Sequence, residues 1–213
     1  MNRRSLIATL LALPLAGQRA VAAEGRYAFE LIDGGPSGDG WLAGIRVKLD
    51  PGWKTYWRMP GDAGIPPEFD WGNSRGVTNI EVLYPLPKRL RDEGGETVGY
   101  ADEVVFPVRC LAEASGAKLS LSVTLGICRE ICIPISTASA IDIGKEGSSS
   151  SESALVARWL EKVPPLGEPV RKAWAEAPDL LAIELAELAT DIFVEGPDSA
   201  YFHAPVFSAD RRQ

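Results

Sequence analysis

The sequence LSLSVTLGICREICIPISTASAIDI, residues 119–143, contains the pattern on which the expected fold depends. Over 119–125, leucine and valine alternate with serine and threonine, a period of two that is typical of a strand buried on one face. Residues 133–143 are rich in Ile, Thr and Ser and predict a second strand. Cys128 and Cys132 lie between these runs. Facing Cα atoms of an antiparallel pair are about 4.5–5.5 Å apart, within the roughly 4.4–6.8 Å that a disulfide needs, so we expect a hairpin that a Cys128–Cys132 bridge can close.

Residues 1–23 have the features of a secretory signal peptide. Two arginines precede an apolar run at 6–16, and the Ala-Val-Ala sequence at 20–22 forms a small-residue cleavage site. The apolar run is too short to span a bilayer, and no later run reaches the length required. We expect cleavage near Ala22 or Ala23 and release, without stable membrane insertion, into an oxidising compartment where disulfides persist. A twin-arginine signal and a buried N-terminal helix are the less favoured interpretations.

The composition is that of a folded, acidic domain. Hydrophobic residues make up 46% and charged residues 24% of the 213 residues, and the net charge is −7. Removal of residues 1–23 takes away three arginines and no acidic residue, so the net charge becomes −10. An acidic surface argues against nucleic acid and against an anionic membrane as partners.

Residues 24–144 are expected to form one all-β domain. Short runs of β-forming residues are separated by Gly- and Pro-rich turns about every ten residues, which is typical of an antiparallel sandwich. We expect 85–99 to be a charged loop. The expected strands are 27–32, 41–49, 54–58, 80–84, 104–108 and the pair within 119–143.

The rest of the chain is expected to hold less regular structure. Residues 145–179 begin with a Ser-rich linker, followed by an amphipathic helix at 152–163 that Pro164-Pro165 ends. Residues 180–213 are expected to open a second, incomplete β unit with a strand at 191–194.

Five motifs together resemble the periplasmic N-terminal region of the DsbD/ScsB thiol:disulfide interchange reductases. They are GWKTYW at 52–57, GDAGIPP at 61–67, GY at 99–100, EVVFP at 103–107 and GICREICIP at 126–134. The resemblance covers 27–143 and continues weakly through 193–197. It implies an immunoglobulin-like sandwich in the periplasm, without a cofactor, that passes electrons through its cysteine pair. It also implies a thioredoxin-fold periplasmic protein and a membrane electron donor as partners, because the family's own thioredoxin-like and membrane domains are not found in this sequence.

The cysteine pair suits thiol–disulfide exchange on chemical grounds alone. Exchange needs one thiolate that attacks a disulfide and a second thiol that resolves the mixed species, and Cys128 and Cys132 supply both roles. Arg129, between them, would favour a thiolate, whereas Glu130 would oppose it. A purely structural bridge is the alternative, but a loop of about five residues contributes only about 2 kcal/mol. We therefore favour a redox pair and leave open which cysteine attacks.

The aromatic residues near the Pro/Gly loop allow two interpretations. Tyr56 and Trp57 are more often core residues than site residues. Together with Met59, they are also candidates for a lid that shields the disulfide from wrong partners.

Two rival functions use the same residues differently. Soft thiolates select Cu(I), so Cys128 and Cys132 could bind copper, with His203 or Met59 as a further ligand. The sandwich could instead be a non-catalytic binding module. Cys110 is the odd cysteine, and we expect it to be a buried hydrophobic side chain without a redox role.

Overall fold

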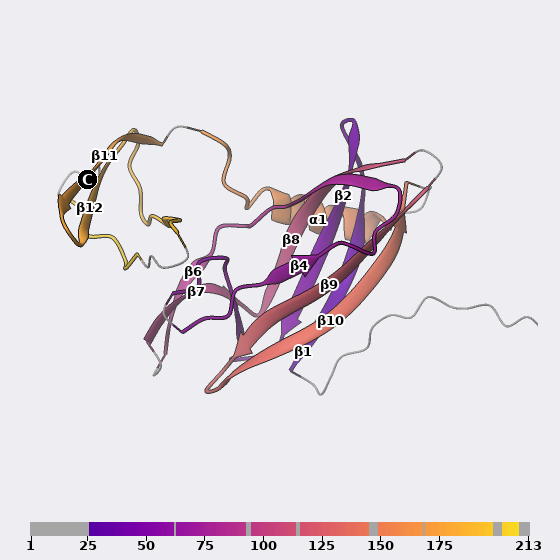
Figure 1. Ribbon diagram of the computed structural model, residues 1–213, viewed down its shortest axis with the longest axis horizontal. Helices are drawn as coiled ribbons and strands as arrows, with labels where there is room; N and C mark the ends of the chain where they lie inside the picture. Colours follow the sequence, from indigo (N-terminus) through magenta and orange to yellow (C-terminus); the bar gives the residue numbers. More distant parts are fainter. Residues whose placement is uncertain are drawn as a thin grey trace, which may run out of the picture.

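The protein is built on two antiparallel sheets that pack face to face (Figure 1). The computed structural model describes residues 26–61, 63–92, 95–113, 116–144, 149–167, 169–197 and 202–208. The predicted signal peptide at 1–23 lies outside these residues. Among the described residues, no helix is both long and apolar enough to cross a membrane.

One sheet has the order β1-β2-β8-β5, and the other β10-β9-β3-β7-β6, with β4 pairing along β9. The first sheet comprises β1 (Tyr27–Ser37), β2 (Gly40–Leu49), β5 (Val77–Val82) and β8 (Glu103–Ala112). The second comprises β3 (Lys54–Tyr56), β4 (Glu68–Asp70), β6 (Lys88–Asp92), β7 (Gly95–Ala101), β9 (Ala117–Cys128) and β10 (Cys132–Ile143).

The main core lies between the sheets and follows the alternation in the sequence. Leu119, Leu121, Val123 and Leu125 are each no more than 2% exposed, whereas the serines and threonine between them are less buried. Phe106 of β8 forms the centre of an aromatic cluster. Its ring centroid lies 5.3 Å from that of Tyr84, 5.3 Å from that of Tyr100 and 5.9 Å from that of Phe69. The predicted all-β sandwich is therefore confirmed.

A single helix in the described chain, α1 (Ser150–Leu160), covers the outer face of the first sheet. Ser149 caps it, because its hydroxyl accepts a hydrogen bond of 3.2 Å from the Glu152 backbone N–H. The absence of a side chain at Gly44 lets the helix approach, since an added Cβ would lie 2.8 Å from Val156. The helix ends at Leu160 rather than at 163, because Pro164 disfavours the helical conformation of the residue before it, and Pro164 and Pro165 have no N–H to donate to the carbonyls of 160 and 161.

The expected loop at 85–99 is wrong, because most of it forms the hairpin β6–β7. Its many charged residues leave no clear alternation of apolar and polar side chains, which is the pattern that predicts a strand. Arg91 lies directly opposite Glu96 and donates to its carboxylate over 2.7 Å. Arg89 donates to the same carboxylate over 3.2 Å. Cross-strand charge pairs thus stabilise a hairpin that has few apolar residues.

The C-terminal region also differs from expectation. It begins with a two-stranded unit, β11 (Val170–Ala177) and β12 (Leu180–Leu185), and β11 falls in the range predicted as linker and helix. This unit lies beyond β6 and β7, away from α1 (Figure 1). The strand expected at 191–194 is not formed. Arg58 and Arg89 of the sandwich bind residues within 191–195 instead.

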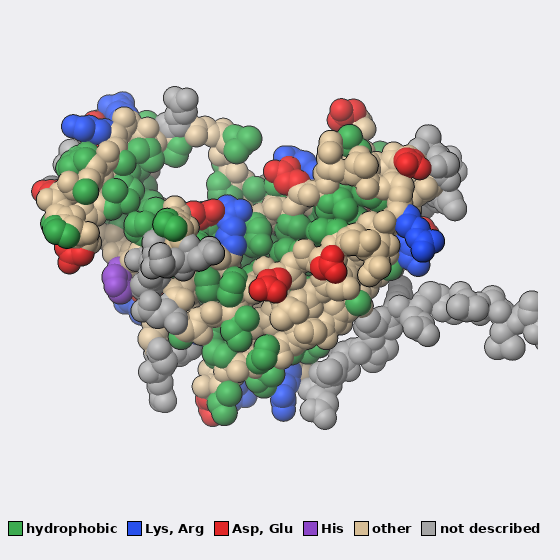
Figure 2. Space-filling view, viewed as in Figure 1, with side chains coloured by type: hydrophobic (Ala, Val, Ile, Leu, Met, Phe, Trp, Pro, Cys, Tyr) green, Lys and Arg blue, Asp and Glu red, His purple; other side chains and the backbone are tan. Residues whose placement is uncertain are grey.

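On the face of the molecule shown in Figure 2, basic and acidic side chains are interspersed among apolar and neutral ones.

Candidate functional site

The two cysteines close the turn between the longest neighbouring strands of the second sheet. Cys128 ends β9, Cys132 begins β10, and the two residues face each other in the antiparallel register. Their Cα atoms are 4.1 Å apart and their sulfur atoms form a disulfide. Residues 129–131 form the connecting turn. The hairpin predicted from the alternation of 119–125 and the Ile-rich run after it is thus present, with the bridge at its tip.

The two sulfur-bearing residues differ in exposure. Cys128 is 5% exposed, whereas Cys132 is only half-buried. The neighbouring Ile131 is 75% exposed, which is unusual for a large apolar side chain. A partner that approaches the turn therefore meets Cys132 before Cys128.

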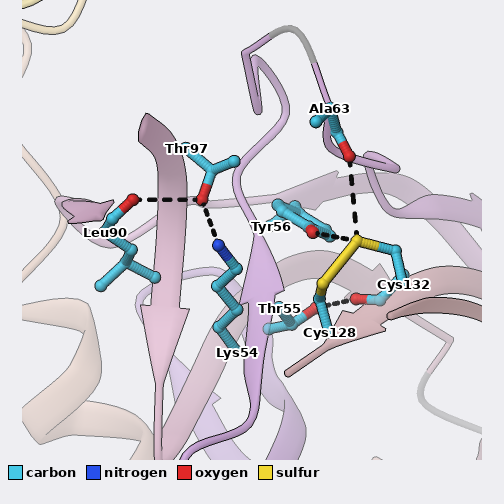
Figure 3. Close-up of a disulfide and its surroundings, with 9 residues drawn as sticks. Lys54, Thr55, Tyr56, Ala63, Leu90, Thr97, Cys128 and Cys132 are labelled. Atoms are coloured by element: carbon cyan, nitrogen blue, oxygen red, sulfur yellow. Dashed lines mark hydrogen bonds between the residues drawn. A yellow bond between two sulfur atoms is a disulfide. The ribbon is translucent and has the colours of Figure 1, made fainter. Parts of the chain in front are cut away.

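Tyr56 of β3 touches the more exposed sulfur. Its hydroxyl oxygen lies 2.9 Å from Cys132 Sγ. A sulfur in a disulfide has no proton, so the tyrosine O–H donates in this state. The carbonyl oxygen of Ala63 lies 3.9 Å from the same sulfur (Figure 3). After reduction, that carbonyl can accept the thiol proton of Cys132.

Two glycines allow the Tyr56 ring to reach this position. A Cβ at Gly126 would lie 3.1 Å from the Tyr56 ring and 2.7 Å from Ile65. A Cβ at Gly64 would lie 2.9 Å from the ring and 2.2 Å from Pro60. The Pro/Gly loop before β4 therefore packs against the tyrosine and the end of β9, close to the disulfide.

β3 aligns the site through its pairing with β9. Lys54 lies opposite Cys128, and Thr55 lies opposite Ile127. The Thr55 hydroxyl donates to the Gly126 carbonyl over 2.8 Å, which ties the two strands together just before the cysteines.

Lys54 belongs to the site but was not among the predicted site residues. It is only 7% exposed, and its Nζ donates to Thr97 Oγ1 over 2.8 Å. Thr97 Oγ1 lies 3.4 Å from the Leu90 carbonyl in turn (Figure 3). The available signal was the GWKTYW motif, because residues i and i+2 of a strand share a face and Tyr56 was already a candidate.

A model of the N-terminal part of the thiol:disulfide interchange protein DsbD matches residues 18–142. The chain belongs to this family. The family and the disulfide together indicate thiol:disulfide interchange as its general chemistry. No curated protein matches the sequence.

Solved structures are similar to this member of the DsbD N-terminal family. The N-terminal periplasmic domain of ScsB from Proteus mirabilis matches with a TM-score of 0.60 and 23% identity, over 80% of this chain and 68% of that one. The reduced DsbD N-terminal domain of Neisseria meningitidis matches with a TM-score of 0.35 and 19% identity, over 60% of this chain and 92% of that one. The ScsB likeness shows the shared fold, which is an immunoglobulin-like sandwich.

The other predicted site residues take different places in this DsbD-type domain. Trp57 is 5% exposed and belongs to the main core, and Met59 is partly buried against the same core. Arg129 and Glu130 are exposed in the turn. The Arg129 side chain passes the turn at Gly52, where an added Cβ would lie 3.8 Å from its Nε. Of the predicted lid residues, Tyr56 contacts a sulfur, whereas Trp57 and Met59 pack in and against the core.

The residues named for copper binding are not assembled into one site. His203 lies beside Arg91 and Glu96, where it lines a shallow hollow at the β6–β7 hairpin. Met59 packs against the core. Within the described ranges, no group of three or more His, Cys, Asp or Glu residues has a geometry suited to a metal ion.

Cys110 lies away from the disulfide, on β8 of the other sheet. It is 3% exposed, and its Sγ lies 3.8 Å from the Trp41 carbonyl. Burial, with a smaller effect of the Asp33 carboxylate, raises the pKa of its thiol to about 11. The prediction that this side chain is buried is confirmed, and its lack of a redox role stays a prediction.

A C-terminal segment packs against residues next to the site. Arg89 donates to the Ile192 carbonyl over 2.8 Å and to the Asp191 carboxylate over 3.1 Å. The Phe193 ring packs edge-on against Trp57, with centroids 5.9 Å apart. Arg58 forms an ion pair with Glu195. Residues 191–195, which we call the C-terminal strap, thus contact the two residues that follow Tyr56.

Proposed function

We propose that this protein is a periplasmic thiol:disulfide exchange module in which Cys132 forms the mixed disulfide and Cys128 resolves it. The observation that carries the proposal is the unequal burial of two bridged cysteines at an exposed hairpin tip. A bridge that served stability alone would need no accessible sulfur, and a loop this short stabilises a chain by only about 2 kcal/mol.

The exchange proceeds in two balanced steps. In the reduced protein, the Cys132 thiolate attacks one sulfur of a client disulfide. A Cys132–client bond forms, and the second client sulfur leaves as a thiolate and takes up a proton. The Cys128 thiolate then attacks Cys132 Sγ, which restores the Cys128–Cys132 bond and releases the first client sulfur as a thiolate that is protonated. Two electrons and two protons have passed to the client.

The surroundings of the pair support this division of roles. Tyr56 can donate to the Cys132 thiolate as it donates to the disulfide sulfur, and hydrogen bonds to charged acceptors are stronger than those to neutral ones. Tyr56 and the Ala63 backbone also cover one side of Cys132 and restrict the approach of unsuitable thiols. We assign Trp57 and Met59 to the support of this cover, and Arg129 and Glu130 to an influence on the charge near the turn.

The partners follow from what exchange requires. A donor must reduce the Cys128–Cys132 disulfide, and we propose a membrane electron donor for this role. The acceptor is proposed to be a thioredoxin-fold periplasmic protein, whose apolar surface would cover the exposed Ile131. Export by the sequence at 1–23, with cleavage near Ala22 or Ala23, brings the chain to these partners.

The test is covalent trapping in the periplasm. Cys128→Ser removes the resolving thiol, so we expect a mixed disulfide between Cys132 and a partner that reductant cleaves on a gel. Cys132→Ser should trap little, and Cys110→Ser provides the matched control. If Cys132→Ser traps a partner and Cys128→Ser does not, Cys128 forms the mixed disulfide and Cys132 resolves it. The absence of any adduct, with tight Cu(I) binding that both substitutions abolish, would support the copper function instead.

A further inference from the structure

A buried lysine lies beside the less exposed cysteine of the pair. Lys54 is 7% exposed and lies directly opposite Cys128 in the antiparallel register of β3 and β9. Directly opposite residues project to the same face, with Cβ atoms about 4.5–5.5 Å apart. Lys54 is therefore a side-chain neighbour of Cys128 within the sheet.

The path of the lysine side chain keeps its charge close to the site. Its ammonium donates to Thr97 Oγ1 over 2.8 Å and lies 5.9 Å from the centroid of the Tyr56 ring. Tyr56 in turn contacts Cys132. Lysine is among the residues least often buried, because removing an ammonium from water is costly. A buried lysine paired with Cys128, with its ammonium near the ring that contacts Cys132, thus suggests a function in the chemistry of the pair.

We propose that Lys54 is a tuning residue that stabilises the thiolate of Cys128. This inference rests on the proposed exchange function and adds a further residue to it. An opposite charge within about 4–6 Å favours the ionised form of a titrating group, by roughly one to three pKa units. Buried charges are also screened less by salt than exposed ones.

The step on which Lys54 acts is the opening of the disulfide. A donor thiolate attacks Cys132 Sγ and forms a donor–Cys132 bond, while the Cys128–Cys132 bond breaks. The electron pair of that bond goes to Cys128, which leaves as a thiolate. A leaving thiol of lower pKa leaves faster, so the ammonium speeds this step. The same charge increases the thiolate population of Cys128 when it acts as the resolving nucleophile.

The experiment titrates Cys128 by itself. A Cys110→Ala, Cys132→Ser background leaves Cys128 as the single cysteine of the chain, since the sequence has three. Thiolate formation is followed by ultraviolet absorbance against pH with Lys54, Lys54→Met, Lys54→Gln and Lys54→Arg. Lys48→Met is the matched control, because Lys48 is an exposed lysine on β2 of the other sheet. Circular dichroism identifies the folded variants.

We expect Lys54→Met and Lys54→Gln to raise the midpoint of Cys128 ionisation by at least about one pH unit, a tenfold change in the thiolate-to-thiol ratio. Lys54→Arg should retain most of the wild-type behaviour, and Lys48→Met all of it. If Lys54→Met does not fold, the Gln variant decides, because its amide can still donate to Thr97. An unchanged midpoint in the folded Met or Gln variant would overturn the proposal.

A second measurement uses all three native cysteines. The rate at which dithiothreitol reduces the disulfide should fall severalfold in the folded Lys54→Gln protein and should be restored by Lys54→Arg, because the rate depends only in part on the pKa of the leaving thiol. An unchanged rate would overturn the proposal. These measurements are independent of trapping in the periplasm. If no partner is trapped but the Lys54 substitutions change the ionisation of Cys128, the proposed exchange partners are wrong and the tuning role of Lys54 stands.

Discussion

At the scale of single residues, the site combines a covered sulfur with an accessible one. Cys128 ends β9 and pairs with Lys54 of β3, whereas Cys132 begins β10 and contacts Tyr56 and the Ala63 carbonyl. The tyrosine hydroxyl can donate both to the bridged sulfur and to a thiolate. The contact is therefore compatible with both redox states, with the stronger bond in the reduced one.

Tyr56→Phe tests that contact. We expect the pKa of the Cys132 thiol to be higher in the variant, because a thiolate loses a donor, and the reduced protein to react more slowly with iodoacetamide at neutral pH. Tyr100→Phe is the control, since it removes a buried hydroxyl that donates to the Pro85 carbonyl over 2.8 Å. Equal loss of thiol reactivity in the two variants would contradict a specific role for Tyr56.

Cys110 provides a second test at this scale. Its thiol pKa is raised to about 11 by burial, so it should resist alkylation at pH 8 while reduced Cys132 is modified. Mass spectrometry of partly alkylated protein checks this, and Cys110→Ser should leave exchange nearly unchanged. If Cys110→Ser abolishes exchange as fully as Cys132→Ser does, Cys110 belongs to the site.

The raised pKa of the Cys110 thiol makes the stability of the protein depend on pH. A thiol in the unfolded chain ionises near pH 8.5, whereas folded Cys110 stays protonated up to about pH 11. The unfolded state therefore loses its proton first, and the free energy of unfolding should fall as pH rises between these values. Cys110→Ala should show a smaller fall in urea denaturation over the same range, and an equal fall would contradict this assignment.

At the scale of elements, the β6–β7 hairpin connects the sandwich with the C-terminal strap. Arg89 carries much of this connection, because it contacts Glu96 within the hairpin and Asp191 and Ile192 in the strap. It also lies 5.0 Å from the Phe193 ring centroid. The strap thus packs on the residues that follow Tyr56 without forming a strand of its own.

Phe193→Ala should loosen this packing. An edge-on aromatic pair contributes about 0.5–1.5 kcal/mol beyond its buried area, so we expect faster amide hydrogen exchange in 57–58 and in β6–β7, with little change in β1 or β2. Leu188→Ala is the control in the same region, because Leu188 is 68% exposed. Equal exchange in the two variants would show that the strap contributes nothing to this part of the sandwich.

At the scale of the whole molecule, the core between the sheets does not depend on the disulfide. The alternating residues of β9, Val47 of β2, Val104 and Val108 of β8 and the cluster around Phe106 are buried by sheet packing. The bridge closes one turn at the edge of this core. A redox pair needs such independence, because the protein must stay folded in both states.

Reduction should therefore cost little stability. The Cys128–Cys132 loop constrains the unfolded chain weakly, so the free energy of unfolding should fall by no more than about 2 kcal/mol. Urea denaturation with and without reductant measures this difference. A reduced protein that is unfolded at room temperature would favour a structural bridge.

The local pattern of the sequence was sufficient for the sandwich, the cysteine hairpin and the amphipathic helix. A period of two over 119–125 places alternate side chains on one face wherever the strand pairs. Two cysteines at the ends of adjacent antiparallel strands then face each other across the turn. The charged hairpin at 88–101 and the strand at 170–177 escaped prediction because neither has a clear alternation of apolar residues.

The surroundings of the sulfurs depended on the tertiary structure. Tyr56 is 76 residues from Cys132 in the sequence, and Thr55 is 71 residues from Gly126. Which strand lies beside β9 follows from the order of strands in the sheet, and local periodicity carries no information about that order. The pairing of β3 with β9 places Lys54 against Cys128, so the charge beside the disulfide is a property of the folded chain that neither motif contains alone.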